Sequence, residues 1–451
     1  MLLENSLAHY YDRIGLVLRT LAQDSVSVGP DFSPGGELPV LTPEVRRFLA
    51  VSDLSHVPLC DYHGKRLALL DLTRNPQTQT TKTFASLVIV ARAVRYIQDT
   101  GERVTIVTPS SANKAVALRD AVLRAITLGL VTEDQLNIVV VVPSGSVPKI
   151  RSSELSTDST LLARNPVAVY AGAQPADVKA LARGVIDEYG RHLEDVAATR
   201  LWYTLQLENY LAADVVRAFA EAEFFPPRAD EPRLHVHAVS SAYGLLGHAY
   251  GRRVLDESGA RPGLPPRYFL VQHLGAPDMV LSLYHGSTGP EHSPDYQYNP
   301  ESGLYGQQSD PRFPALTFDP HETLDATFYT RNPVTSPQMN ELIRSQGGGG
   351  MVVSLHECLQ RYAYVRAVLS EAGVPLPTDP REVREWSLVM AMTGILNAVD
   401  RGLIDEQDIL VHGSGAYTTD ACRPIPADAL WNVDSKDELR DIMLKACAPD
   451  S

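Results

Sequence analysis

The chain has 451 residues, 44% of them apolar and 21% charged, which excludes a disordered protein and leaves room for two or three domain-sized units. The formal net charge is −14 and no run of arginine or lysine is present, which argues against nucleic acid or an anionic membrane as a partner. The early polar residues Glu4, His9 and Asp12 argue against a signal peptide, and the apolar run at 138–142 is too short to span a bilayer.

The cysteines give no sign of a metal site or of a disulfide framework. Cys60, Cys358, Cys422 and Cys447 are scattered along the chain without the spacing of metal ligands. We therefore expect reduced structural thiols in a cytoplasmic protein.

The first 51 residues are predicted to form an N-terminal helical extension, with a helix between Leu2 and Leu21. From residue 52 onward, short aliphatic runs alternate with longer helical patterns. The predicted strands cover residues 67–72, 104–107, 136–142, 167–170, 234–239, 268–272 and 408–412. The predicted helices cover residues 114–128, 175–189, a segment around 246–254, 355–372 and 383–401. Strands separated by helices are typical of βαβ units, so we predict an α/β fold with mostly parallel sheets.

Residues 284–320 are different, being rich in Pro, Gly, Ser, Tyr and Asp. This composition predicts a long loop, which is uncommon unless it is functional or mobile. Farther on, Ser354 and Glu357 have the spacing of a capping box ahead of the helix at 355–372.

Lys82 lies where a predicted strand and a turn lead into a helical pattern. The partial positive charge of a helix N-terminus disfavours an ammonium there, and burial would add to that effect. Such a lysine is a candidate nucleophile. The alternative is an ordinary surface lysine whose stem lies along the helix.

Three later junctions carry small polar residues at the carboxyl ends of predicted parallel strands, where open α/β sheets bind ligands. The first holds Ser110, Ser111 and Asn113, which offer hydroxyls, backbone N–H groups and an amide to an anion or a planar ligand. The alternative for this junction is a plain helix N-cap.

The second junction, Ser240-Ser241-Ala242-Tyr243-Gly244, leaves backbone N–H groups free to bind a phosphate at a helix N-terminus. The third, His412-Gly413-Ser414-Gly415, lets His412 or Ser414 hydrogen-bond to a heteroaromatic nitrogen. Tight structural turns are the alternatives for both. An amine, an amide, a phosphate site and a ring-nitrogen partner together match the needs of pyridoxal phosphate.

The order of these motifs resembles the fold-type II pyridoxal-phosphate enzymes, the tryptophan synthase β-like superfamily, and within it the threonine synthase branch. The resemblance covers roughly residues 52–418. Val57-Pro58-Leu59 resembles the family's Thr-Pro-Leu, and Asn75 to Lys82 resembles its Asn-Pro-Thr-Gly-Ser-Phe-Lys Schiff-base motif. Ser111-Ala112-Asn113 resembles its Ser/Thr-Gly-Asn loop, Ser240 to Gly244 occupies the place of its phosphate loop, and Leu396 to Tyr417 resembles its last helix, strand and Thr-Gly-x-Gly turn.

The chain departs from the family pattern at several of these positions. One extra residue separates Asn75 from Lys82, and Thr83 stands where the family usually has Asp. Ala112 replaces a glycine, Ala242 and Tyr243 replace phosphate-loop glycines, and His412 replaces a hydroxyl residue.

The resemblance implies two doubly wound domains, a large one of residues 52–85 and 205–451 and a small one of residues 86–204, with the cofactor in the cleft between them. It implies a catalytic Lys82 that binds the cofactor, together with Asn113, Ser240, Ser241, Ala242, Tyr243, Gly244, His412 and Ser414. Thr81, Ser110 and Ser111 would bind the substrate. The expected reaction is elimination or replacement at the β or γ carbon of an amino acid, in a possible homodimer.

Several other interpretations remain open. The chain could be a non-catalytic relative that keeps the fold as a binding module, or a serine hydrolase acting through Ser240, although no Gly-x-Ser-x-Gly elbow surrounds that residue. The glycine run at 347–350 looks like a phosphate loop, but no predicted strand precedes it. His235 and His237 share one face of a strand and could bind a metal, yet no third ligand is evident nearby, so packing is favoured and no metal is expected.

Overall fold

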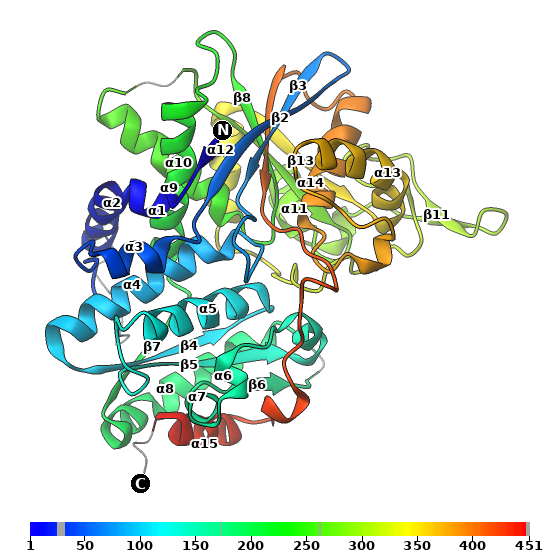
Figure 1. Ribbon diagram of the computed structural model, residues 1–451. Coiled ribbons are helices and arrows are strands. Elements are labelled where there is room, and N and C mark those ends of the chain that lie inside the picture. Colours follow the sequence, from blue (N-terminus) through cyan, green and yellow to red (C-terminus); the bar gives the residue numbers. More distant parts are fainter. Residues whose placement is uncertain (25–31, 173, 261–262, 448–451) are drawn as a thin grey trace. The chain divides into compact units, whose positions relative to one another are not determined.

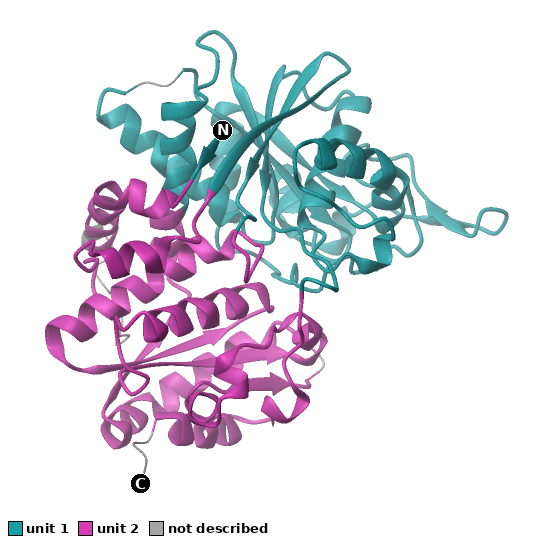
Figure 2. Cartoon of the chain, viewed as in Figure 1, with its two compact units in different colours: residues 1–3, 54–74, 214–421 teal, residues 4–53, 75–213, 422–451 magenta. Residues whose placement is uncertain are grey.

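A computed structural model describes residues 1–24, 32–172, 174–260 and 263–447 (Figure 1). The chain divides into two compact units (Figure 2). The first unit holds residues 1–3, 54–74 and 214–421, and the second holds residues 4–53, 75–213 and 422–451. Within the described ranges, no helix has both the length and the apolar character needed to cross a bilayer.

The first unit is built on a seven-stranded sheet with the strand order β1-β2-β3-β14-β8-β9-β13. From β3 to β13 all neighbours are parallel, and β1 and β2 add an antiparallel edge. The strands are β1 (Leu2–Leu3), β2 (Leu54–Tyr62), β3 (Lys65–Asp71), β8 (Arg233–Ala238), β9 (Arg267–His273), β13 (Gly348–Val353) and β14 (Asp408–Gly413).

Helices cover both faces of this sheet. On one face, α13 and α14 share a core with Leu234 and Val236 of β8. The alternate β8 residues His235 and His237 are also buried, and His235 meets a side chain of α10. The helices of the unit are the C-terminal part of α9 (Leu207–Phe224), α10 (Tyr243–Glu257), α11 (Asp278–His285), α12 (Ser336–Gln346), α13 (Leu355–Glu371) and α14 (Ser387–Asp400), with short 3-10 helices at Pro290–His292 and Pro380–Glu382.

The second unit is built on a five-stranded, fully parallel sheet with the order β15-β6-β5-β4-β7. Its strands are β4 (Arg103–Pro109), β5 (Leu136–Pro143), β6 (Val167–Tyr170), β7 (Thr199–Tyr203) and β15 (Leu430–Val433). Its helices are α1 (Ser6–His9), α2 (Tyr11–Asp24), α3 (Pro43–Leu49), α4 (Lys82–Thr100), α5 (Asn113–Thr127), α6 (Glu154–Thr157), α7 (Ser159–Arg164), α8 (Asp177–Ala197), the start of α9 and α15 (Lys436–Cys447), with 3-10 helices at Ser144–Lys149 and Ala427–Ala429.

Residues 422–451 fall in the second unit because β15 pairs with β6 and α15 packs on α8. The expectation from the sequence had placed this segment with the rest of 205–451. The N-terminal residues 4–53 also fall in this unit, where Arg92 of α4 donates a hydrogen bond from Nε to Gly35 O at 2.6 Å.

The predicted α/β architecture and all seven predicted strands are confirmed, with ends shifted by a residue or two. One half of the predicted capping box is present, since Ser354 Oγ accepts a hydrogen bond from Glu357 N at 3.2 Å. The Glu357 carboxylate accepts instead from Ala315 N at 3.2 Å and from Asn397 Nδ2 at 3.0 Å. All four cysteines are free thiols. Two expectations were wrong in detail: the helix expected from residue 383 begins at Ser387, and the N-terminal helix is split into α1 and α2 after a short strand.

The segment expected to be a long loop contains a three-stranded antiparallel sheet of β10 (Gln297–Asn299), β11 (Leu304–Gly306) and β12 (Leu316–Thr317). Figure 1 shows the hairpin at β11 extending away from the seven-stranded sheet. The sequence analysis predicted no strand at the glycine run 347–350, but Gly348 begins the edge strand β13. A Cβ on Gly348 would meet Tyr268 O at 2.0 Å, so glycine allows β13 to lie against β9.

Candidate functional site

Lys82 is the first residue of α4 and is partly buried. The turn before it is organised by Asn75, whose Oδ1 accepts from Thr80 N at 3.2 Å and whose Nδ2 donates to Thr80 O at 3.1 Å. The N-cap Thr81 is buried. Gln79 has φ 52, so this turn uses the left-handed region at a residue other than glycine. The loop therefore delivers Lys82 to a helix start, as the sequence predicted.

The loop before α5 is held by Ser110, whose Oγ accepts hydrogen bonds from Ala112 N at 3.2 Å and Ala115 N at 3.0 Å. Ser110 therefore caps α5. This is the N-cap that the sequence analysis gave as the alternative to ligand binding at this junction. Ala112 is fully buried with φ 104 and ψ −61, a conformation that costs an alanine about 1–3 kcal/mol. The loop keeps a glycine-like backbone although the side chain has changed. Asn113 begins α5, and Ser111 is partly buried.

The loop of Ser240 to Gly244 connects β8 to α10 in the first unit. Ala242 has φ 51, again in the left-handed region, and its carbonyl accepts from Leu245 N and Leu246 N, both at 3.1 Å. Ser241 O accepts a hydrogen bond from Thr335 Oγ1 at 2.7 Å. Ser240 Oγ is buried and has no hydrogen-bond partner among the described residues. A buried hydroxyl without a partner is costly and marks a position where a ligand can bind.

Close packing of α10 on α9 explains the glycines that follow this loop. A Cβ on Gly244 would lie 2.6 Å from Arg217 Nη2, and one on Gly247 would lie 2.3 Å from Asp214 Cβ. Gly251 likewise faces Ala218 Cβ at 2.9 Å. Glycine at these positions lets the guanidinium of Arg217 lie directly against the first turn of α10.

Ser414 follows β14 in the same way that Ser240 follows β8. Its Oγ is also buried without a hydrogen-bond partner in the described part of the chain. The next residue is anchored, since Gly415 O accepts from Ser387 Oγ and Leu388 N, both at 3.2 Å. Because β14 and β8 are parallel neighbours, with Val411 opposite Val236, the two serines emerge at the same edge of the sheet.

His412 is fully buried, and both of its ring nitrogens are already engaged. Nδ1 lies 2.9 Å from Arg217 Nη1, and Nε2 lies 3.0 Å from His235 Nδ1. A guanidinium can only donate, so Nδ1 of His412 must accept and Nε2 must carry the proton. Nε2–H then donates to His235 Nδ1, which places the proton of His235 on Nε2. We infer that a single direction of donation runs through both rings.

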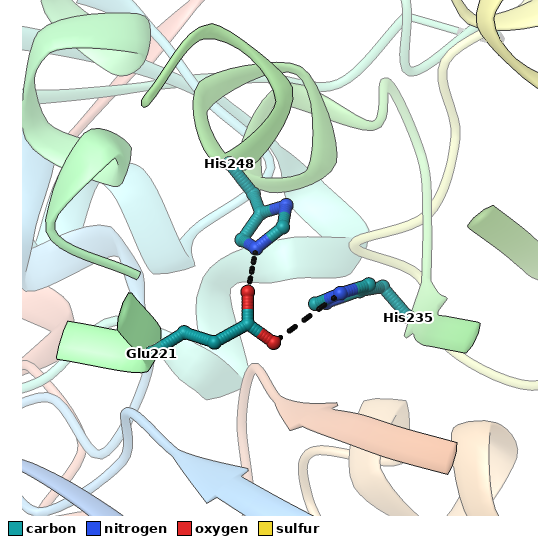
Figure 3. A group of neighbouring side chains, drawn as sticks. All are labelled: Glu221, His235 and His248. Atoms are coloured by element: carbon teal, nitrogen blue, oxygen red, sulfur yellow. Dashed lines mark hydrogen bonds and ion pairs between the residues drawn. The ribbon is translucent and has the colours of Figure 1, made fainter. Parts of the chain in front are cut away.

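Glu221 is the acceptor at the end of this chain of donors (Figure 3). Its carboxylate accepts hydrogen bonds from His248 Nε2 and Arg233 Nη1, both at 2.9 Å. His235 Nε2 lies 3.5 Å from Glu221 Oε1, which is within ion-pair range, but it makes no hydrogen bond to the described residues. On the far side, His248 Nδ1 lies 3.0 Å from Tyr268 Oη, which donates to it. The result is a buried network centred on the Glu221 carboxylate.

Electrostatics agree with this assignment. Burial lowers the pKa of His235, His248 and His412, so all three imidazoles are neutral. Burial alone would raise the pKa of Glu221, but the donors of His235 and His248 and the charge of Arg233 outweigh it and hold that pKa well below its usual range. Glu221 is therefore ionised and its negative charge is matched by Arg233.

The same three side chains could be taken for a metal site, because ligand atoms of Glu221, His235 and His248 lie within 4.8 Å of one another. The sequence suggested His235 and His237 as a pair of metal ligands. In the structure, the neighbours of His235 are Glu221 and His248. His237 is not part of this group, and its Nδ1 lies 2.6 Å from Ala238 O. A metal needs lone pairs at the two Nε2 atoms. Nε2 of His248 donates to Glu221, and the contacts of His412 with Arg217 and His235 place the proton of His235 on Nε2 as well. Reversing the tautomers would put an N–H of His412 against the N–H of Arg217, so the cluster is a hydrogen-bond network.

The predicted site residues thus form two groups, one within each unit. Lys82, Thr81, Ser110, Ser111 and Asn113 lie in the second unit, and Ser240 to Gly244, His412 and Ser414 lie in the first. Sequence reasoning missed the residues that surround the second group, which are Asp214, Arg217, Glu221, His248 and Tyr268. One signal was present, since Asp214, Arg217 and Glu221 recur at i, i+3 and i+7 and are the charged residues of the stretch 210–222, which is otherwise apolar apart from Tyr210.

Comparison with known proteins identifies the family. The chain belongs to the family described as "Family of unknown function (DUF6002)", whose model matches residues 2–447. A crystal structure of PLP-bound threonine synthase from Brucella melitensis is similar, with 14% identity, a TM-score of 0.55 and coverage of 97% of this chain and 89% of that chain. Threonine synthase from Escherichia coli is similar too, with 15% identity, a TM-score of 0.53 and coverage of 97% and 90%. These likenesses confirm the predicted fold, and the search of curated proteins gives no match.

Proposed function

We propose that this protein binds pyridoxal phosphate through Lys82 and catalyses elimination or replacement at the β or γ carbon of an amino acid. The observation that carries the proposal is a pair of buried hydroxyls, Ser240 and Ser414, at the ends of adjacent strands, neither of which has a hydrogen-bond partner among the residues that the structure describes. They occupy the loops expected to hold the phosphate and the ring nitrogen, in a fold shared with threonine synthases. A serine hydroxyl can donate a hydrogen bond to a phosphate oxygen or to the ring nitrogen of the cofactor.

The left-handed alanines support the same assignment. Ala112 and Ala242 stand where the resembled family has glycines, and both keep the backbone conformation that glycine favours. Such strain persists where the surrounding structure requires the loop shape. The two loops therefore retain the form needed to present backbone N–H groups to an anion.

Each residue then has a defined task. When bound, the cofactor supplies an aldehyde for an amine and a conjugated ring that accepts an electron pair from the substrate. Lys82 would provide the amine. The N–H groups of residues 240–244 at the start of α10 would hold the phosphate, and Asn113 the phenolic oxygen.

Ser414 is favoured over His412 as the partner of the ring nitrogen, because both nitrogens of His412 are engaged by Arg217 and His235. Thr81, Ser110 and Ser111 would orient the substrate carboxylate, which aims the Cα–H bond towards a base.

Cofactor attachment gives the first test. Borohydride reduction of protein mixed with pyridoxal phosphate, followed by peptide mapping, is expected to place the label on Lys82. Lys82→Met should lose the label completely, because no amine remains at the start of α4. Lys65→Met is the control, since Lys65 lies in the first unit and donates to Asp405 O at 2.9 Å. A label confined to any other lysine contradicts the assignment.

A panel of amino acids then separates an enzyme from a binding module. Serine, O-acetylserine, O-phosphoserine, O-phosphohomoserine and S-adenosylmethionine are added to the loaded protein. At least one is expected to change the cofactor's absorption spectrum and to release its leaving group. A spectrum that no amino acid changes would support the non-catalytic binding module.

The two candidate phosphate loops, residues 240–244 and 347–350, give a further test. Gly244→Ala should weaken pyridoxal phosphate binding by about tenfold or more, because the new Cβ displaces Arg217 and shifts the first turn of α10. Gly348→Ala should leave the affinity unchanged and lower stability, since its Cβ would meet Tyr268 O and its φ is 112. Fluorescence titration measures affinity and thermal unfolding measures stability. The opposite pattern would assign the phosphate to the run at 347–350.

A further inference from the structure

Lys114 is a buried lysine that the proposed function does not use. It is the second residue of α5 and is only 8% exposed. Lysines are almost never fully buried unless they are paired. Nζ of Lys114 donates to Thr204 O at 2.6 Å and lies 5.6 Å from the centre of the Tyr210 ring. No carboxylate of the described chain forms an ion pair with it.

Nζ of Lys114 lies at the carboxyl ends of the strands in the second unit's sheet. Thr204 directly follows β7, and Thr204 N donates to Val107 O of β4 at 3.3 Å, so this carbonyl marks the carboxyl ends of two parallel strands. Thr108 Oγ1 and Thr204 Oγ1 are both buried there without a hydrogen-bond partner among the described residues. Three polar groups with unused hydrogen-bonding capacity therefore gather where parallel sheets bind ligands.

The charges around Lys114 are of its own sign. Burial lowers the pKa of Lys114 well below its usual value, and the positive charges of Lys82 and Lys179 lower it further. These two lysines, from α4 and α8, are the titratable groups that act on it, together with the face of the Tyr210 ring from α9. Both effects favour the uncharged form of the amine, whose lone pair can accept a proton.

A purely structural role explains this arrangement poorly. One hydrogen bond to a carbonyl and an aromatic ring at 5.6 Å do not compensate a buried ammonium. An apolar side chain of similar size would fill the same space at lower cost. The amine is kept at an edge of the sheet that also carries the proposed substrate loop, Ser110 and Ser111.

We propose that Lys114 is a second functional amine of this site, a proton acceptor that stays available while Lys82 is bound to the cofactor. In the proposed step the Cα–H bond of the amino acid breaks and an N–H bond forms at Lys114 Nζ. The electron pair stays with the substrate, where the conjugated ring delocalises it. This inference rests on the proposed function, but the charge state of Lys114 can be measured without any cofactor.

The first experiment measures that charge state in the unloaded protein. The chain has only seven lysines, so spectra of protein labelled with ε-¹³C-lysine can be assigned by substitution. At about pH 7.5 the Lys114 signal is expected at the position of an uncharged amine, whereas a free lysine with a pKa of about 10.4 is still charged. Lys82→Met should move the titration of Lys114 to higher pH, because a like charge is removed. A Lys114 signal that titrates like that of free lysine overturns the proposal.

The second experiment separates a proton acceptor from a structural lysine. Lys114→Met and Lys114→Arg are compared for pyridoxal phosphate affinity, melting temperature and exchange of the substrate's α-proton with solvent. Both should retain the affinity and lose exchange by on the order of a hundredfold. Arginine restores the hydrogen-bond donor, but it stays protonated and cannot accept a proton.

The outcomes are distinguishable. Rescue of exchange by Lys114→Arg, or full exchange in Lys114→Met, overturns the role of Lys114. A wild-type protein that binds no pyridoxal phosphate overturns the proposed function and with it the catalytic step, while the labelling experiment still decides whether Lys114 is uncharged.

Discussion

Glu221→Gln is expected to lower the free energy of unfolding by about 3–5 kcal/mol, because it removes one member of a buried charged network. The carboxylate receives His248 Nε2 and Arg233 Nη1, both at 2.9 Å, and His235 at 3.5 Å. An amide would turn an N–H group towards one of these donors and would leave Arg233 with Asp408 as its remaining carboxylate partner. Urea unfolding followed by circular dichroism measures the change.

The same substitution at Glu223 is the matched control, since this residue is exposed on the same helix. Glu223→Gln should change stability by no more than about 0.5 kcal/mol. Equal effects of the two substitutions would mean that the network around Glu221 contributes no more to the free energy of unfolding than the exposed Glu223 does.

Acid is expected to unfold the protein well before most carboxylates titrate. His235, His248 and His412 have a lowered pKa in the folded state, so below their usual pKa the unfolded chain binds more protons than the folded one. Their stabilising contribution is complete above about pH 6.5 and is lost as the pH falls. Glu221, whose folded pKa is also lowered, adds a second loss at lower pH.

The size of the effect follows from proton linkage. Each histidine contributes up to about 1.4 kcal/mol per pH unit, so the three together cost roughly 3–4 kcal/mol between about pH 7 and pH 5.5. His248→Gln should reduce the proton uptake on unfolding near pH 5.5 by about one. Stability that does not depend on pH across this interval would show that the imidazoles are charged in the folded state.

The sheets and the loops at the carboxyl ends of their strands could be predicted because their signals are local. Aliphatic runs such as 138–142 identify strands buried on both faces, and small hydroxyl residues after them identify loops that end in helix starts. Lys82, Ser110 and Ser240 were assigned to such loops or helix starts in this way. The helix start at Lys82 and the cap formed by Ser110 depend on residues within a few positions of them.

The network behind the site could not be predicted, because its members are far apart in the chain. Arg217 and His412 are 195 positions apart and His235 and His412 are 177, and no local pattern links them. The same holds for the glycine run at 347–350, whose strand conformation depends on contact with Tyr268 and with Tyr284, the latter donating to Gly350 O at 3.2 Å. Sequence alone identified His412 as unusual, but only its neighbours show that both nitrogens are engaged.

The pairing of β15 with β6 has a consequence for the order of assembly during synthesis. The nascent chain presents β4, β5, β6 and β7 long before the ribosome reaches residues 430–433. Until then β6 is an edge strand with unpaired backbone groups, and the face of α8 that packs on Leu439 and Met443 is uncovered. The second unit must therefore wait for the last segment of the chain before its sheet is complete. Chaperones that bind exposed strand edges would have their longest opportunity to act at β6.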